Sequence, residues 1–197
     1  MRQLQHVIDE VGRLREEVPC GHSRTEGLRP TVSWPHVAFV GLGSNLAAPI
    51  LQVSRALEAL GGLPQTRVLG HSSLYRSAPV GYLQQPDFIN AVAQLETQLT
   101  PRALLDALLA LEHKCGRTRD FHNAPRTLDL DLLLYDELVH HEHGLTLPHP
   151  QMHLRAFVLL PLFEIAPKGV IPGIGAIAQA AKECAGQDVE RIRDATQ

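Results

Sequence analysis

The sequence predicts an α+β fold: a ferredoxin-like α/β sandwich with an antiparallel sheet and flanking helices. Two observations lead to this prediction. Apolar segments typical of strands and amphipathic segments typical of helices alternate in the order β-α-β-β-α-β. The chain has 197 residues, of which 44% are hydrophobic and 20% charged, a balance that supports a domain with a buried core.

Residues 1–35 are predicted to form an N-terminal extension, separate from a domain at 36–197. Prolines and glycines between residues 19 and 35 indicate a linker. Before the linker, apolar residues with helical spacing predict a short amphipathic helix: Leu4, Val7, Ile8, Val11 and Leu14.

The domain begins with an apolar strand at 37–40 and a glycine-rich turn at 41–46. This turn is either a tight strand-to-helix connection or part of a nucleotide site. It lacks the third glycine of a dinucleotide fingerprint and the Lys-Ser/Thr pair of a phosphate-binding loop, so neither familiar motif applies. Pro49 then begins a helix that Gly61-Gly62 ends.

The middle of the domain contains two predicted strands, at 67–75 and 88–99, joined by a Pro/Gly/Gln loop at 76–87. Thr100-Pro101 predicts the cap and first turn of a second helix, which Gly116 ends.

The rest of the chain starts with a basic loop at 116–126 and a strand that runs to residue 135. A loop rich in His and Pro follows. The chain then has an apolar helix at 156–165 and an amphipathic segment after Pro172.

Asp129 and Asp131 are the most informative residues of the chain. They alternate with leucines in an apolar strand, so both carboxylates point to the same face, roughly 6.6 Å apart along the strand. Such a pair repels unless a cation lies between the carboxylates, and Mg²⁺ with phosphate chemistry is the natural candidate. The alternative is the solvated face of an edge strand, where charges discourage aggregation.

The basic loop provides cations next to this strand: Lys114, Arg117, Arg119 and Arg126. Guanidinium groups bind phosphate oxygens bidentately, so several of them beside a metal site suit a triphosphate. Taken alone, such a charge run is usually a solvated surface.

Phe88 and Asn90 alternate on one strand and share a face, so they could stack on and hydrogen-bond a flat heterocycle. Core packing is the default role for such a phenylalanine. His141-Glu142-His143 is a weak zinc motif because no further ligands are evident.

The composition and charge of the chain argue against binding to nucleic acid or to a membrane. The net charge of −3 gives no electrostatic case for binding nucleic acid or a membrane surface, and no apolar run is long enough to span a membrane. Residues 1–17 are charged throughout, unlike a signal peptide, and the three cysteines have no metal-ligand spacing. We expect a cytoplasmic protein that acts as a monomer on small molecules.

Seven segments resemble those of a known family in order and spacing: Gly43-Ser44-Asn45-Leu46, Ser73-Leu74-Tyr75-Arg76-Ser77-Ala78-Pro79, Gln85-Pro86-Asp87-Phe88-Ile89-Asn90, Gly116-Arg117-Thr118-Arg119, Pro125-Arg126-Thr127-Leu128-Asp129-Leu130-Asp131, Leu147-Pro148-His149 and Arg155-Ala156-Phe157. The family is that of 6-hydroxymethyl-7,8-dihydropterin pyrophosphokinase (2-amino-4-hydroxy-6-hydroxymethyldihydropteridine diphosphokinase). Each segment is weak alone, but the set is specific, and the resemblance covers residues 37–172.

The resemblance implies the site and its ligands. Asp129 and Asp131 would hold two Mg²⁺ ions, with ATP as co-substrate, and Asp131, Arg117 and Arg126 would be catalytic. The implied ATP-binding residues are Glu112, Arg117, Arg119, Arg126, His149 and Arg155. The implied pterin-binding residues are Ser77, Ala78, Pro79, Val80, Phe88, Asn90 and Phe157.

The implied reaction belongs to folate biosynthesis. The hydroxymethyl oxygen of the pterin attacks the β-phosphorus of ATP in line, AMP leaves, and a pyrophosphoryl group is transferred. Whether Asp131 or metal coordination assists the attacking alcohol is left open.

The sequence departs from the family pattern at a few positions. Asn123-Ala124 stands where the family usually has Trp-Gly, the basic loop is about one residue shorter, and Pro150 follows His149. Two alternatives stand beside the enzyme. One is a non-catalytic or regulatory pterin- or nucleotide-binding domain, in which the altered loop has cost activity. The other is a different Asp-x-Asp nucleotide-using transferase.

Overall fold

The computed structural model of the chain describes residues 34–81, 84–115 and 126–193. The predicted helix and linker before residue 34 and most of the basic loop lie outside these ranges. The elements in chain order are β1 (His36–Ser44), α2 (Pro49–Leu60), β2 (Thr66–His71), β3 (Tyr75–Ser77), β4 (Phe88–Thr97), α3 (Pro101–Lys114), β5 (Asp129–Tyr135), β6 (His140–Glu142), β7 (Leu145–Leu147), a 3₁₀ turn (Met152–Leu154), α4 (Ala156–Ile165), β8 (Val170–Ile171), β9 (Gly175–Ala176), α5 (Ile177–Glu183) and β10 (Val189–Arg191).

The central sheet contains six strands in the order β10-β3-β4-β1-β5, and β2 pairs with β4 beyond the end of β3. All of these pairings are antiparallel. Without β3 and β10, the order β5-β1-β4-β2 with two crossover helices is the ferredoxin-like arrangement. The predicted fold class is confirmed.

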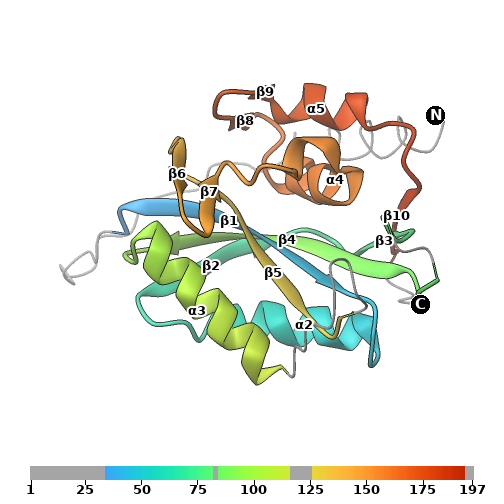
Figure 1. Ribbon diagram of the computed structural model, residues 1–197, viewed down its shortest axis with the longest axis horizontal. Helices are drawn as coiled ribbons and strands as arrows, with labels where there is room; N and C mark the ends of the chain where they lie inside the picture. Colours follow the sequence, from blue (N-terminus) through green and yellow to red (C-terminus); the bar gives the residue numbers. More distant parts are fainter. Residues whose placement is uncertain (1–33, 82–83, 116–125, 194–197) are drawn as a thin grey trace, which may run out of the picture.

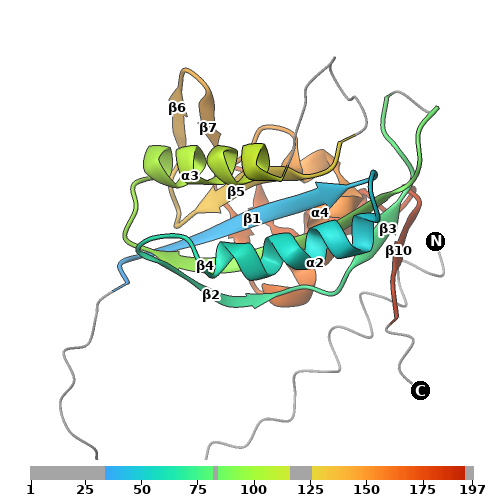
Figure 2. The same ribbon diagram turned by 90° about the horizontal axis from the view of Figure 1, so that it is seen from below.

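Helices cover both faces of the sheet. Figure 1 shows α2 and α3 on one face and α4 and α5 on the other, and Figure 2 shows α2 and α3 lying side by side across the sheet. Each face has its own core of buried residues. Leu60, Leu104 and Leu108 belong to the core under α2 and α3, whereas Leu159 and Leu162 belong to the core under α4.

The three helices predicted within the described residues, beginning at Pro49, at Thr100-Pro101 and at Ala156, are confirmed. Pro49 is the first residue of α2, and Thr100 caps α3 by accepting a hydrogen bond from the backbone N–H of Ala103 at 3.3 Å. The helix α4 has buried residues on every side because it lies between the sheet and α5, which explains its uniformly apolar sequence. None of the helices in the described ranges is long and apolar enough to cross a membrane.

Two predictions about strands were wrong. Residues 41–44 are not a turn but the second half of β1, because Gly41 and Gly43 pair with β4 on one side and β5 on the other. The strand predicted at 67–75 is two strands, since the chain leaves β2 after His71 and begins β3 at Tyr75. The short strands β6 to β10 were not predicted.

Candidate active site

Asp129 and Asp131 lie on one face of β5, near the start of the strand. Leu130 between them is buried on the opposite face, so the predicted alternation is confirmed. Asp129 is opposite Gly43 of β1, and Asp131 is opposite Gly41. Because glycine has no side chain, no Cβ of β1 lies beside either carboxylate. This pair of oxygen donors suits a hard cation.

Arg126 brings a positive charge to the same place. Its guanidinium group forms an ion pair with the carboxylate of Asp129. Both side chains are about one-fifth exposed, at 20% and 19%. An anionic ligand that reached Asp129 through a bridging cation would therefore also meet Arg126.

Asn45 links three parts of the site. Its Oδ1 accepts a hydrogen bond from the backbone N–H of Arg126 at 2.8 Å. Its Nδ2 donates to the side chain of Gln85 at 2.9 Å and to the carbonyl of Pro86 at 3.1 Å. Only 2% of Asn45 is exposed. No role was predicted for Asn45 from the sequence, although a polar residue directly after a buried strand is the kind of signal that marks such a position.

Glu112 is buried at 1% exposure in the last turn of α3. Its Oε1 accepts a hydrogen bond from the backbone N–H of Leu130 at 2.6 Å. Because β5 is the last strand on this side of the sheet, Glu112 satisfies a donor on its outer edge, between the two aspartates. The predicted contact of Glu112 with ATP stays a prediction.

His149 approaches the carboxylates from the loop after β7. Its backbone N–H donates to the carbonyl of Leu133 at 2.9 Å, which holds the loop against β5. Its Nδ1 accepts a hydrogen bond from the backbone N–H of Gln151 at 3.3 Å, so the neutral ring carries its proton on Nε2. Burial, helped by the positive charge of Arg155, lowers the pKa of His149 to about 4, against an opposing effect of Asp129.

A second group of polar side chains lies on β3 and β4, on the same face of the sheet as the aspartates. Asn90 is opposite Gly43, and its Nδ2 donates to Ser77 Oγ at 3.0 Å and, weakly, to the carbonyl of Tyr75 at 3.5 Å. Phe88 is opposite Ser77. Asn90, Gly43 and Asp129 thus form one row across three strands, which places Asn90 and the predicted metal ligand on either side of a glycine.

The start of α4 brings Arg155 and Phe157 together. The Arg155 guanidinium lies over the Phe157 ring, 5.7 Å from its centroid. Phe157 is partly buried against the core under α4. Past β3, Ala78 and Val80 are exposed, and the backbone N–H of Ala78 donates to the carbonyl of Asp188 at 3.4 Å.

Arg117 and Arg119 lie outside the described residues, so the structure neither supports nor opposes their roles. In the described ranges no group of three or more His, Cys, Asp or Glu side chains could hold a metal ion. Glu142 pairs with Arg102 and His140 instead, and zinc binding there has no support. A cation at the two aspartates needs ligands from phosphate or water, as Mg²⁺ often has.

A family model described as 7,8-dihydro-6-hydroxymethylpterin-pyrophosphokinase (HPPK) matches residues 39–167, well over half of the chain. The chain belongs to this family. The matched range begins within β1 and ends just after α4, so it contains both groups of residues described above.

Curated HPPK relatives match along nearly their whole length. A 2-amino-4-hydroxy-6-hydroxymethyldihydropteridine pyrophosphokinase of Haemophilus influenzae is 45% identical over 155 residues, which are 79% of this chain and 97% of the relative. The Pseudomonas aeruginosa protein of the same name is 46% identical over 154 residues, 78% of this chain and 95% of the relative. The chain is thus a member of a family of diphosphokinases, which are transferases.

Solved HPPK structures share the fold. A wild-type HPPK-DHPS of Plasmodium falciparum, solved with pterin and p-hydroxybenzoate, superposes with a TM-score of 0.60 at 14% identity. The match covers 75% of this chain but 43% of the solved chain, so this chain spans less than half of that protein.

Proposed function

We propose that this chain transfers a pyrophosphoryl group from ATP to the hydroxymethyl group of 6-hydroxymethyl-7,8-dihydropterin, releasing AMP in a step of folate biosynthesis. The observation that carries the proposal is the pair Asp129 and Asp131, which lie partly exposed on one face of β5, in a chain that belongs to the HPPK family. The curated relatives carry the name of this activity.

Asp129 and Asp131 would hold two Mg²⁺ ions against the triphosphate. When bound, such ions neutralise the negative charge of the phosphates, so that the triphosphate can lie against the two carboxylates. The two carboxylates fit this role because they share a face and are partly exposed. Asp131 would in addition lie next to the reacting alcohol.

Arg126 would bind the triphosphate because it already lies at Asp129. His149, with a proton on Nε2, can donate one hydrogen bond to a phosphate oxygen. Arg155 would add a further positive charge on the same side, and Glu112 would contact the nucleotide. From the sequence, Arg117 and Arg119 would complete the set. Fixed donors and cations of this kind stabilise the charge that develops during phosphoryl transfer.

The pterin would bind between Phe88 and Phe157, with its edge against Asn90 and the backbone of residues 77–80. Two donor bonds hold the Asn90 amide, so its Oδ1 remains as an acceptor toward the ligand. Asn90 and Asp129 lie in one row of the sheet, separated by Gly43. The hydroxymethyl group and the triphosphate would then meet above β1, as an in-line transfer requires. We further propose that the chain works as a monomer, without nucleic acid or membrane.

The test is nucleotide analysis of the purified chain with ATP, magnesium and 6-hydroxymethyl-7,8-dihydropterin. We expect AMP that depends on the pterin, reduced by at least about a thousandfold in Asp129→Ala and Asp131→Ala. Asp106→Ala, on the exposed side of α3, is the matched control and should leave the rate unchanged. Release of ADP, or AMP that does not depend on the pterin, would contradict the proposal.

A further inference from the structure

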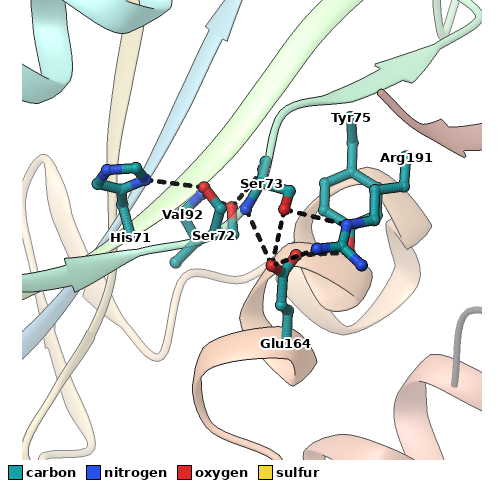
Figure 3. A network of polar contacts seen from close by, with 7 residues as sticks. All are labelled: His71, Ser72, Ser73, Tyr75, Val92, Glu164 and Arg191. Atoms are coloured by element: carbon teal, nitrogen blue, oxygen red, sulfur yellow. Dashed lines mark hydrogen bonds and ion pairs between the residues drawn. The ribbon is translucent and has the colours of Figure 1, made fainter. Parts of the chain in front are cut away.

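Glu164, near the end of α4, gathers four donors on one carboxylate. Its Oε1 accepts from the backbone N–H of Ser73 at 3.1 Å, from Ser73 Oγ at 2.8 Å and from Arg191 at 3.4 Å. Its Oε2 accepts from the hydroxyl of Tyr75 at 2.8 Å. Figure 3 shows the carboxylate below Ser73, with Tyr75 and Arg191 reaching it from the same side. One side chain therefore joins α4 to the segment before β3, to β3 itself and to β10.

Arg191, in β10, completes the cluster. Its Nε donates to Ser73 Oγ at 3.0 Å while its guanidinium pairs with Glu164. The two charged side chains are 24% and 16% exposed, and Tyr75 is fully buried. An ion pair that is largely shielded from water and fully hydrogen-bonded holds its geometry more tightly than an exposed one.

This cluster lies on the same face of the sheet as the side of the site assigned to the pterin, and it adjoins that side at Tyr75. Tyr75 is paired with Asn90 in the sheet, and Ser77, two residues on, accepts the hydrogen bond from Asn90 Nδ2. The strand β3 has only three residues, so few ladder bonds to β4 hold it. Its outer edge is covered by β10, which Arg191 ties down.

We propose that Glu164 and Arg191 are positioning residues for the pterin: they hold β3 against α4 and so fix Ser77 and the amide of Asn90 in the geometry that reads the edge of the heterocycle. The inference rests on the proposed binding of the pterin at Ser77, Phe88 and Asn90. Neither residue of the cluster needs to touch the ligand. The contacts of Glu164 run to Ser73, Tyr75 and Arg191, which lie on the pterin side of the site, so we expect the effect to fall on the binding of the pterin.

The test compares the KM for each substrate in Glu164→Gln and Arg191→Met. Glutamine keeps the size of the side chain but loses the charge that Arg191 pairs with. We expect the KM for the pterin to rise about tenfold, the equivalent of one or two hydrogen bonds, with the KM for ATP and kcat within about twofold. Arg191→Lys keeps the charge and should recover part of the loss. A merely structural role would lower the melting temperature and the active fraction but leave both KM values unchanged.

Two further variants distinguish a failure of the positioning role from a failure of the proposed pterin site. Glu96→Gln removes an ion pair with Arg67 at the other end of β4 and should alter neither KM. Asn90→Ala tests the pterin site itself. A raised pterin KM in Asn90→Ala but not in Glu164→Gln or Arg191→Met would overturn the positioning role alone. An unchanged pterin KM in all three would overturn the proposed pterin site as well. If Glu164→Gln does not fold, Tyr75→Phe removes a single donor from the cluster and should still raise the pterin KM severalfold.

Discussion

His149 is held as a neutral imidazole in the free protein. Burial and the charge of Arg155 lower its pKa to about 4, and the bond from Gln151 places the proton on Nε2. A histidine in the unfolded chain has a pKa near 6.5, so between these two values the unfolded state binds more protons than the folded state. The contribution of His149 to stability is therefore complete above about pH 6.5 and is lost as the pH falls toward 4.

We predict that this loss is on the order of 3 kcal/mol in the metal-free protein. Urea unfolding at a series of pH values would measure it, and NMR titration of the imidazole would locate the pKa. In His149→Asn the free energy of unfolding should fall less between pH 6.5 and pH 4 than in the parent chain. An imidazole that titrates near pH 6.5 would contradict the prediction.

At single positions, the sequence predicted the side-chain orientations that follow from the alternation of a strand. It did not predict the hydrogen bonds to residues far away along the chain. Asp129 and Asp131 share a face because a strand alternates, and this needs no knowledge of the rest of the chain. The partners of Asn45 are 40, 41 and 81 residues away along the chain. No pattern within a short window could identify them.

Among the secondary-structure elements, β1 decides how much space the site has. Gly43 lies between Asn90 and Asp129, and a Cβ added there would be 3.4 Å from Asn90 Oδ1. We predict that Gly43→Val places methyl groups in this row and lowers kcat/KM for both substrates by at least about tenfold. The melting temperature should not fall, because valine suits a strand better than glycine does.

Gly70 of β2 provides the matched control for this change. It lies in the same sheet, but a Cβ added there would meet nothing within 4 Å. Gly70→Val should therefore leave both kcat/KM values unchanged in steady-state assays. Equal losses of activity in the two variants would show that the effect of Gly43→Val is not local to the site.

The elements differ in how far the sequence could predict them. The helices α2 and α3 carry their own start signals at Pro49 and Thr100, so their positions were predictable. In contrast, β3 and β10 have three residues each and pair with each other across more than a hundred residues of chain. Arg191 and Ser73 stabilise that pairing, and such a contact becomes visible only in the folded chain.

On the scale of the whole molecule, the candidate site lies where one of the two cores ends. The face of the sheet under α2 and α3 carries apolar residues such as Leu42, Leu130 and Leu132. On the opposite face, the core under α4 includes Val92 of β4 and Leu133 of β5. The same strands carry Asn90 two residues before Val92 and Asp129 four residues before Leu133. Polar groups are thus placed on rigid strands, beside a packed core that limits their movement.

The domain is predicted to begin at residue 36. The contacts of residues 34–37 indicate where a shortened chain can begin without losing interactions with the rest of the domain. Asp136, just after β5, accepts a hydrogen bond from the backbone N–H of Val37 at 2.7 Å and pairs with the ring of His36 at 2.7 Å. The ring of Trp34 lies under the guanidinium of Arg67, at 5.4 Å. All of these contacts survive in a chain that begins at residue 34.

We therefore predict that a chain of residues 34–197 has kcat and both KM values within about twofold of the full chain, with an unchanged melting temperature. A chain of residues 38–197 loses the contacts of Asp136 with His36 and Val37 and should be less stable by roughly 1–3 kcal/mol. Its activity at low temperature should remain, because Asp136 and Asp129 lie at opposite ends of β5, roughly 20 Å apart. Steady-state kinetics and urea unfolding of the three chains would decide the matter. A large loss of turnover already in residues 34–197 would mean that the first 33 residues contribute to the site, and that the domain boundary is wrong.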